Sequence, residues 1–450
     1  MPKAEDPETG LIPLMNLIIQ AMSYSRRKWA LSEESREYSP HIVLGSTRRL
    51  AFTLMLPYSF AVLGFWGVWL PPDWPPGWKS RLYCFYTVVM IILVYTNTLS
   101  QVIDLLLTYK SLKHFINNAF ILLSTIGAGV KAAHCLYIRR RILEIKEKLN
   151  AYPCKPQDNQ ETAILQHFSR IIKILNIYYI GLYVCTITAL TTVSFFRDVP
   201  KHQLYYHAWL PFNYSSSGRF WAAYMHQVIA HGFDACMHAA YDTIAPGIMI
   251  QGCAQFAILN HRLQMLPKLV DRVRDKLVFD SPQDEVSRRT RVMRFEVKKL
   301  AECVRHHLEI FQLTDENNKI FGIMIFLQYS LSSVVICLSV LKLSQVNTFH
   351  PALISVILYL ICMISQVFMP CYSGHQITLQ STKVSDAIFS MDWLDLEIAT
   401  KKSLILIMQR SQKPLQFTTG YIITLSIGSF NKLMKLSYSV FNVLHGSSSF

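Results

Sequence analysis

Charged residues are scarce in this 450-residue chain: they make up 16% of it, whereas hydrophobic residues make up 51%. A soluble domain typically carries about 25% charged residues. The composition therefore disfavours a soluble globule and favours a polytopic membrane protein. The formal net charge is +15, but the basic residues lie between long apolar runs and form no stripe on a soluble face. We therefore expect no nucleic-acid partner.

The sequence also lacks the motifs of most enzymes. It contains no phosphate-binding glycine loop, no H-E-x-x-H, no G-x-S-x-G and no C-x-x-C pair, so nothing in it indicates a nucleotide site, a zinc protease, a serine hydrolase or a dithiol centre. Its ten cysteines lie mostly inside apolar runs, and none has metal-site spacing. We expect packed or free thiols, no metal, no cofactor and no enzymatic activity.

Long apolar runs are what the sequence does have. A membrane span needs about 20 mainly apolar residues, and eight stretches qualify: 49–70, 83–107, 116–138, 173–196, 221–254, 320–343, 352–372 and 418–443. The first contains Pro57 and ends in GFWGVWLPPDWPPGW, which is rich in Trp, as segments near lipid headgroups are. We interpret 49–82 as an interfacial or re-entrant helix with its loop. The expected fold is all-α, with seven transmembrane helices.

Basic residues alternate between the loops and thereby predict the orientation. They are dense in the linkers 139–173, 255–315 and 373–417, whereas 344–351 has none. By the positive-inside rule the N-terminus is cytosolic and the C-terminus extracellular. The start, MPKAEDPETG, has no basic region typical of a signal peptide. The predicted organisation is a cytosolic segment 1–48, spans one to four within 83–254, an extracellular loop 197–220, a cytosolic helical linker 255–319, spans five and six within 320–372, a cytosolic subunit-contact region 373–417, a seventh span 418–443 and an extracellular tail 444–450.

One sequence motif agrees with this orientation. Asn213-Tyr214-Ser215 is the only N-glycosylation sequon, and it falls in the loop 197–220. A glycan acceptor belongs on the extracellular side. We therefore predict that Asn213 is glycosylated.

Several ionisable residues lie inside the predicted spans, where lipid makes them expensive. His238 and Asp242 are four residues apart and share a helical face. We interpret them as a structural hydrogen-bonded pair that faces protein or water, and Lys131 as buried against a partner. The alternative is a metal site formed by residues of the fourth span, His226, His231, His238, Asp234 and Asp242.

The last predicted span contains SFNKLMKLSYSVFNVL and has one polar side. At about 100° per residue, five polar residues cluster in an arc of about 140°: Ser429, Lys432, Lys435, Ser439 and Asn442. The opposite stripe is apolar and comprises Ile423, Ile427, Phe430, Met434, Tyr438 and Phe441. The polar side is either buried within a helical bundle or lines a water-filled pore. A pore requires several copies around an axis, and Val443 would then be an apolar constriction that gates by dewetting.

Short motifs follow one another along the C-terminal third. They are Q-x-F at 366–368, Trp393, R-x-Q-K-P at 410–414, Gly420 and S-Y-S-x-F at 437–441; GFWGVWLPP at 64–72 is a further one. As a set, and with loop lengths that agree over nearly the whole chain, they resemble the insect odorant receptor family. His375 and Gln380 depart from the Asn and Glu that the family tends to have.

The resemblance implies a ligand-gated, non-selective cation channel in the plasma membrane of olfactory neurons, at the sensory dendrite or cilium. Four subunits assemble around the seventh span, usually a tuning receptor with a common co-receptor; a homotetramer is the alternative. The chain lacks the very long loop of the co-receptor and so resembles a tuning subunit. The implied partners are a small volatile odorant, the co-receptor, membrane lipid and permeant cations. The family's gate falls on Val443, with Asn442 and Leu444 beside it and Ser439 on the same polar face.

The resemblance also implies a ligand pocket within each subunit, in the outer half of spans two, three, four and six. The matching positions are Ile121, Ser124, Thr125, Tyr183, Thr186, Leu190, Tyr224, Gln227, Val228, His231, Tyr359 and Cys362. These halves are rich in aromatic, aliphatic and hydroxyl side chains, which suits a small, mostly apolar ligand. Ordinary helix packing is the alternative for each residue. Tyr359 is the strongest single candidate, because a buried hydroxyl needs a partner.

Two other functions fit the composition. A gustatory-type chemoreceptor channel shares the architecture, but its T-Y-x-x-x-x-x-Q-F ending is absent. A membrane transporter tends to contain internal repeats with broken pairs of spans, and the sequence offers little of this beyond Pro57 and Pro246. Both are less favoured than an odorant receptor.

Overall fold

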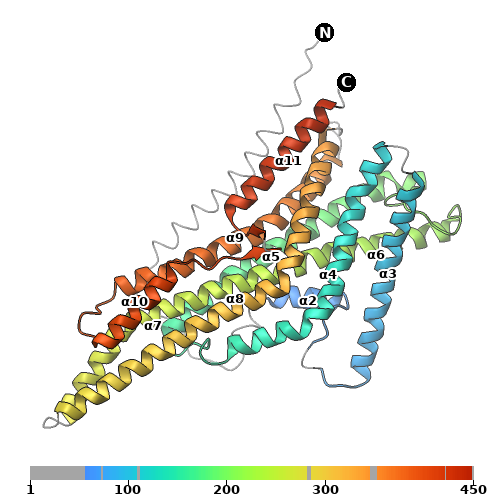
Figure 1. The fold of residues 1–450 in the computed structure, drawn as a ribbon. Coiled ribbons are helices and arrows are strands. Elements are labelled where there is room, and N and C mark those ends of the chain that lie inside the picture. Colours follow the sequence, from blue (N-terminus) through green and yellow to red (C-terminus); the bar gives the residue numbers. More distant parts are fainter. Residues whose placement is uncertain are drawn as a thin grey trace. The chain divides into compact units, whose positions relative to one another are not determined.

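The computed structural model describes residues 56–71, 74–108, 112–280, 285–344, 352–420 and 422–447, which all belong to one unit of the chain, Ala51–Phe450. The described part is almost entirely helical, which confirms the predicted all-α class (Figure 1). Its helices are α2 (Pro57–Phe65), α3 (Trp78–Thr108), α4 (Leu112–Asn150), α5 (Asn159–Arg197), α6 (Ser217–Tyr241), α7 (Ile244–Asp280), α8 (Glu285–Ser344), α9 (Ala352–Phe389), α10 (Ile398–Ser411) and α11 (Ile427–Ser447), with a 3-10 turn η1 (Val199–Lys201). Strands β1 (Thr418–Thr419) and β2 (Ile423–Thr424) pair antiparallel.

The helix α7 is central to the packing. It contacts α5, α8 and α9, while α4 packs on α6 and α8 (Figure 1). Every residue from 237 to 256 is buried. Helix α7 lies close to α9 at Gly252, where a Cβ would lie 2.6 Å from Cδ1 of Ile377 and would displace that side chain. The core of the described unit is therefore built around the end of α6 and the first half of α7.

The predicted fourth span, 221–254, is not one continuous helix. The chain leaves the helix at Asp242 and Thr243, between α6 and α7. Proline explains the position of this break, since Pro246 has no N–H and its ring would clash with the carbonyl of residue 242 in a continuous helix. Thr243 Oγ1 donates to the carbonyl of Ala240 at 2.9 Å and so satisfies one backbone acceptor at the break.

The short helix α2 fills this break. Ser59 Oγ lies 2.6 Å from Thr243 Oγ1 and accepts a hydrogen bond of 2.7 Å from Asn176 Nδ2 of α5. Pro57 begins the helix and does not interrupt it, as is usual for proline in a first turn. The nine residues of α2 extend over about 14 Å, against the roughly 30 Å of a bilayer core. Of the predicted interfacial segment 49–70, residues 49–55 lie outside the described residues, as does the predicted cytosolic segment 1–48.

Five described segments are long and apolar enough to cross a membrane: Trp78–Leu107, Ile121–Asn150, Asn159–Lys201, Glu285–Val340 and Leu353–Phe389. They coincide with predicted spans one, two, three, five and six. Predicted spans four and seven fall on α6 with the start of α7, and on α11. The number of seven spans and the orientation stay predictions.

The helix of the predicted seventh span begins later than residue 418. Residues 418–419 and 423–424 pair as β1 and β2, and Gly420 beside them has a φ of 57°. This left-handed conformation favours glycine, and a Cβ there would lie 2.9 Å from Cγ of Phe326. Helix α11 starts after Ser426, whose Oγ accepts the backbone N–H of Ser429 at 3.1 Å, as an N-cap does. Ile423, predicted on the apolar stripe of the helix, lies in β2 instead.

Candidate functional site

A buried polar network connects α4 with the end of α6. Nζ of Lys131 lies 2.6 Å from Oδ1 of Asp242, and the two side chains are 3% and 1% exposed. The same Nζ is 2.8 Å from Nδ1 of His238. Nε2 of His238 is 3.1 Å from the carbonyl oxygen of Ser124, which can only accept, so Nδ1 is free to accept from lysine. Charges this deep must be paired. Lys131 is buried against a partner, as predicted. His238 and Asp242 do not form the predicted direct hydrogen bond, because Nδ1 lies 3.9 Å from Oδ2, and Lys131 bridges them instead.

Gln366, the first residue of the Q-x-F motif, extends the network into α9. Its Nε2 donates to Oδ2 of Asp242 at 2.8 Å and lies 2.9 Å from Nδ1 of His238. Its Oε1 accepts from Ser332 Oγ of α8 at 3.2 Å. Tyr179 of α5 adds a hydrogen bond of 3.4 Å to Asp242. A side-chain amide suits this position because it donates and accepts at once, and so links helices on both sides.

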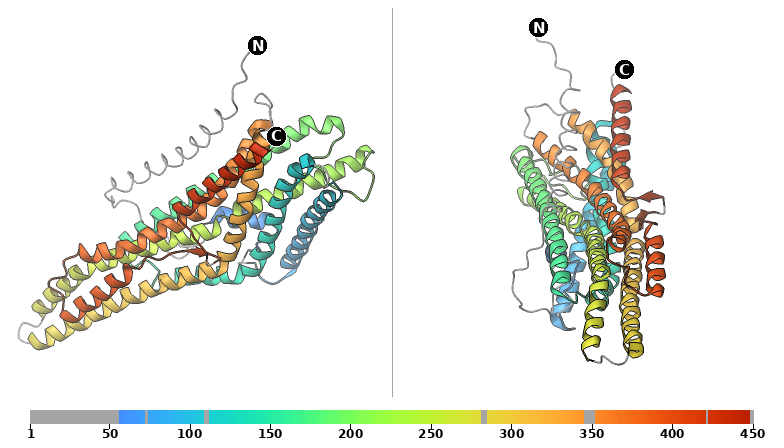
Figure 2. Two further views of the ribbon diagram at one scale, coloured as in Figure 1. Left: turned by 45° about the horizontal axis from the view of Figure 1, so that its top comes forward. Right: turned by 90° about the vertical axis from the view of Figure 1, so that its left-hand side faces the viewer.

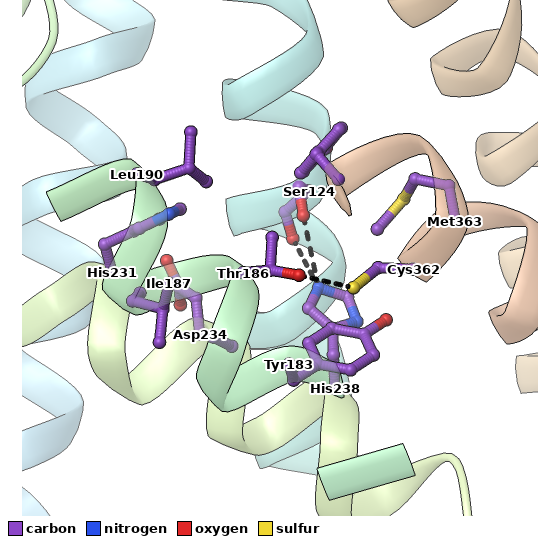
Figure 3. Close-up of a pocket in the computed structure, with 12 residues that line it drawn as sticks. Ser124, Tyr183, Thr186, Ile187, Leu190, His231, Asp234, His238, Cys362 and Met363 are labelled. Atoms are coloured by element: carbon purple, nitrogen blue, oxygen red, sulfur yellow. Dashed lines mark hydrogen bonds between the residues drawn. The ribbon is translucent and has the colours of Figure 1, made fainter. Parts of the chain in front are cut away.

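A pocket lies directly beside the network (Figure 3). It is enclosed by α4, α5, α6 and α9, and its lining residues are Ser124, Tyr183, Thr186, Ile187, Leu190, His231, Asp234, Ala235, His238, Tyr359, Cys362 and Met363. Aliphatic and aromatic side chains with a few hydroxyl and ionisable groups are typical of a small-molecule site. His238 belongs to both the pocket wall and the network.

The structure brings seven of the twelve predicted ligand residues together around this pocket: Ser124, Tyr183, Thr186, Leu190, His231, Tyr359 and Cys362. Contacts between the lining residues tie its walls together: Thr186 Oγ1 lies 3.1 Å from Cys362 Sγ, and the rings of Tyr183 and His238 stack with centroids 6.3 Å apart. These contacts place the residues at one pocket, and ligand binding by them stays a prediction.

The other five predicted residues lie elsewhere. Thr125 Oγ1 points to Gln101 of α3, at 3.4 Å from its Oε1. Tyr224 donates to Ser194 at 3.4 Å, and Gln227 donates to the backbone of Tyr206 at 3.3 Å. Ile121 and Val228 are half-buried and are not among the lining residues.

Five lining residues were not predicted: Ile187, Asp234, Ala235, His238 and Met363. A signal for two of them was available, because Asp234 and His238 follow His231 by three and seven residues and so share its helical face.

The loop between η1 and α6 closes over the region of His231. The rings of Tyr205 and His231 are 5.4 Å apart, and Tyr206 is buried with its hydroxyl 2.7 Å from Oδ1 of Asn97 on α3. Asn213 of the same loop is exposed, and its Oδ1 accepts the backbone N–H of Ser215 at 2.9 Å. Glycosylation at Asn213 stays a prediction.

The terminal helix α11 packs on α8 and α9 with its apolar side (Figure 2). Phe430 is buried and its ring lies 5.4 Å from that of Phe368, two residues after Gln366. The residues on the opposite side are exposed: Lys432, Lys435, Ser439 and Asn442. These four residues are therefore not buried within the subunit, and the lining of a pore by them stays a prediction. Val443 and Leu444 lie in α11, but their side chains are outside the described part of the structure.

The sequence model of the family described as 7tm Odorant receptor matches residues 111–438. The chain belongs to the odorant receptor family. It is therefore a multi-pass membrane receptor of the olfactory class, as the C-terminal motifs predicted, and the match favours this assignment over the gustatory and transporter alternatives.

Relatives match over most of their length. The receptor is 25% identical over 410 residues to Odorant receptor Or1 of Anopheles gambiae, covering 89% of this chain and 96% of the relative. It is 23% identical over 394 residues to Odorant receptor 2a of Drosophila melanogaster, covering 85% and 96%. The solved insect olfactory receptor OR5 of Machilis hrabei in complex with eugenol matches with a TM-score of 0.72 and 16% identity, covering 87% of this chain and 97% of that one. This last likeness shows the fold.

Proposed function

We propose that the receptor is the odorant-binding subunit of a ligand-gated, non-selective cation channel in the plasma membrane of olfactory neurons. The observation that carries the proposal is the pocket between α4, α5, α6 and α9. His238 belongs both to its wall and to the buried network, and α9 contributes Tyr359, Cys362 and Met363 to the wall. A solved relative of the same fold is complexed with eugenol, a small volatile molecule.

The lining decides which ligands the pocket accepts. Its aliphatic and aromatic side chains stabilise an apolar molecule by removing it from water, worth about 25 cal/mol per Å² of buried apolar surface. Hydroxyl groups of Ser124, Thr186 and Tyr183 offer one or two hydrogen bonds that orient the molecule. A volatile of modest size, mostly apolar with a single polar group, fits these conditions.

Helix α9 connects the pocket with α11. Tyr359 and Cys362 in the pocket wall precede Gln366 by seven and four residues, so all three lie on one helical face. Two residues further on, Phe368 meets Phe430 of α11 at 5.4 Å. A ligand that fits one arrangement of α9 better than another shifts the population of α11 arrangements by its differential affinity. Moving a closed-to-open ratio from 99:1 to 1:99 takes about 5.5 kcal/mol.

The pore is formed, on this proposal, by the exposed polar side of α11 in four copies around an axis, with the co-receptor supplying the remaining subunits. Ser439 and Asn442 then line the conduit and Val443 closes it near the outer end. Lys435 and Lys432 lie about two and three turns deeper than Val443, where hydrated side exits or acidic groups of neighbouring subunits offset their charge. A constriction of apolar side chains excludes water, and with it cations, until it widens.

Electrical recording tests the proposal. The receptor is expressed with the co-receptor, surface delivery is confirmed with a tag, and currents are recorded during application of an odorant panel; the co-receptor alone is the control. We expect at least one volatile to evoke a cation current that requires both chains. Absence of any evoked current, with both chains at the surface, contradicts the channel function.

Two variants of α5 locate the ligand. Leu190→Trp fills the pocket and is expected to abolish the response, whereas Val184→Trp adds the same bulk on the exposed side of the same helix and is expected to preserve it. Equal responses of the two variants would move the ligand site away from this pocket.

The orientation has an independent test. Enzymatic deglycosylation is expected to change the electrophoretic mobility of the wild type and not that of Asn213→Gln. A glycan acquired instead by a sequon engineered into the linker 255–319 would reverse the proposed orientation.

A further inference from the structure

Asp234 is a buried carboxylate in the pocket wall. Its side chain belongs to a residue that is 4% exposed, and neither Oδ1 nor Oδ2 has a hydrogen-bond partner among the described residues. Figure 3 shows it between His231 and His238 along the α6 side of the pocket. Lys131, the cation of the network, is bound to Asp242 and His238 and forms no ion pair with Asp234 among the described residues.

Folding alone gives no reason for this arrangement. A carboxyl group removed from water without a hydrogen bond is costly, and native proteins keep few such groups, which tend to have a functional role. Two other ionisable or polar groups of the wall have partners: Thr186 Oγ1 donates to the carbonyl of Leu182 at 2.8 Å, and His238 is bonded on both ring nitrogens. Asp234 is thus a residue of the pocket wall whose buried carboxyl oxygens have no hydrogen-bond partner among the described residues.

We infer that the pocket takes a small, largely apolar ligand that carries an N–H or O–H group and donates it to the Asp234 carboxyl. The inference rests on the proposed role of this pocket as the odorant site and specifies its ligand class. The apolar body of the ligand lies against Ile187, Leu190 and Met363, while its donor reaches the α6 wall. Alcohols, phenols and amines satisfy this description, and hydrocarbons, ethers and esters do not.

The discrimination follows from what is left unpaired. A ligand with an N–H or O–H donates to the carboxyl oxygens that have no partner in the empty pocket, whereas an ether of the same size cannot donate to them. Sites that bind through a buried polar group reject analogues lacking the matching group more strongly than they reject changes in apolar bulk. An amine gains more than an alcohol, because a hydrogen bond between charged partners is the stronger one.

Matched probes test the inference. Hexan-1-ol and hexan-1-amine are compared with methyl pentyl ether, and 4-ethylphenol is compared with its isomer 4-methylanisole. For the wild type we expect half-maximal responses at a concentration at least tenfold lower for the donors. Asp234→Leu removes the acceptor at similar size and is expected to erase the difference by weakening the donors. Asp275→Leu replaces an exposed aspartate of α7 and is the control, expected to keep it.

A second variant separates the two kinds of donor. Asp234→Asn keeps a carbonyl acceptor but removes the negative charge, so the alcohols are expected to stay within a few-fold of the wild type while the amine loses most of its advantage. The same variant covers the case in which Asp234→Leu fails to fold. Equal potency of donors and ethers in the wild type, or an unchanged donor preference in Asp234→Leu, overturns the inference.

Binding is also measured without the channel, as the ligand-induced rise in unfolding temperature of the purified receptor. If donors stabilise the wild type more than ethers and Asp234→Leu loses this, the inference stands even where no current is evoked and the channel function has failed. If no donor probe stabilises the wild type, the inference fails whatever the currents are.

Discussion

Replacing Lys131 by methionine tests whether the buried network holds the helices together. The variant keeps the length and apolar stem of the side chain but removes its charge, so Asp242 loses the contacts at 2.6 Å and 2.9 Å while remaining 1% exposed. Removing one partner of a buried ion pair typically costs about 3–5 kcal/mol of stability, because the charge of the other partner is left uncompensated. Gln366 still donates to Asp242 at 2.8 Å, so we expect about 3 kcal/mol.

The assay is thermal unfolding of the purified receptor. With an unfolding entropy of about 2.1 cal/mol/K per residue, a loss of about 3 kcal/mol lowers the midpoint of a chain of this length by about 3 °C. The chain offers a matched control, because Lys319 and Asp315 are also 2.6 Å apart but 64% and 58% exposed. Lys319→Met removes a pair worth about 0–1 kcal/mol and is expected to shift the midpoint by at most about 1 °C.

A double variant decides the reason for the loss. Lys131→Met combined with Asp242→Asn leaves no charge in this network and keeps a carbonyl acceptor for Gln366, so it is expected to recover part of the stability. The explanation by an uncompensated charge would be refuted if Lys131→Met were as stable as the wild type. It would also be refuted if the loss of stability in the double variant equalled the sum of the losses in the two single variants.

Three further predictions concern other parts of the chain. Gly420→Ala forces a side chain into a left-handed turn and against Phe326, and should lower stability by about 1–3 kcal/mol, measured by thermal unfolding. Val443→Ala should raise the resting current, and an unchanged leak would move the gate elsewhere. Partial burial raises the pKa of Asp158, but the hydrogen bond to its helix N-terminus and that to His261 outweigh this and leave the pKa below 3.8. A lowered carboxyl pKa stabilises the folded state at pH values above the ordinary pKa, and this stabilisation is lost as the pH falls through the lowered pKa. Asp158→Ala should therefore cost about 1 kcal/mol of stability at pH 7 and less at pH 3.

Much of the helical framework could be predicted from the sequence, because long apolar runs have few alternatives to helix in a membrane. The predicted span at 352–372 lies inside α9, and the charged stretch after residue 254 is helical in α7 and α8. The break at Asp242 was missed although Pro246 marks it. The hairpin before α11 was also missed, since Gly420 looks like an ordinary residue of an apolar run until its φ is known.

The candidate site was predictable only in part, and for a physical reason. Motif positions indicate which turn of a helix faces the pocket, so Tyr183, Thr186 and Leu190 on α5 all line it. They do not indicate how far along a neighbouring helix the cavity extends. On α6 the pocket lies one to two turns further from the loop than expected, which leaves Tyr224 and Gln227 outside it. Partners far apart in sequence, such as Lys131 and Gln366, become apparent only once the helices are packed.

The contact of Ser59 with Thr243 and Asn176 has a practical consequence for shortening the N-terminus. Deleting α2 removes the acceptor of the Asn176 amide at the helix break before Pro246, whereas the Thr243 hydroxyl keeps its hydrogen bond to the carbonyl of Ala240. A shortened receptor that begins before residue 56 retains the contacts of α2 with Thr243 and Asn176, and one that begins at α3 loses them. Removing α2 therefore removes a buried contact of the core, although this helix precedes the first long hydrophobic helix.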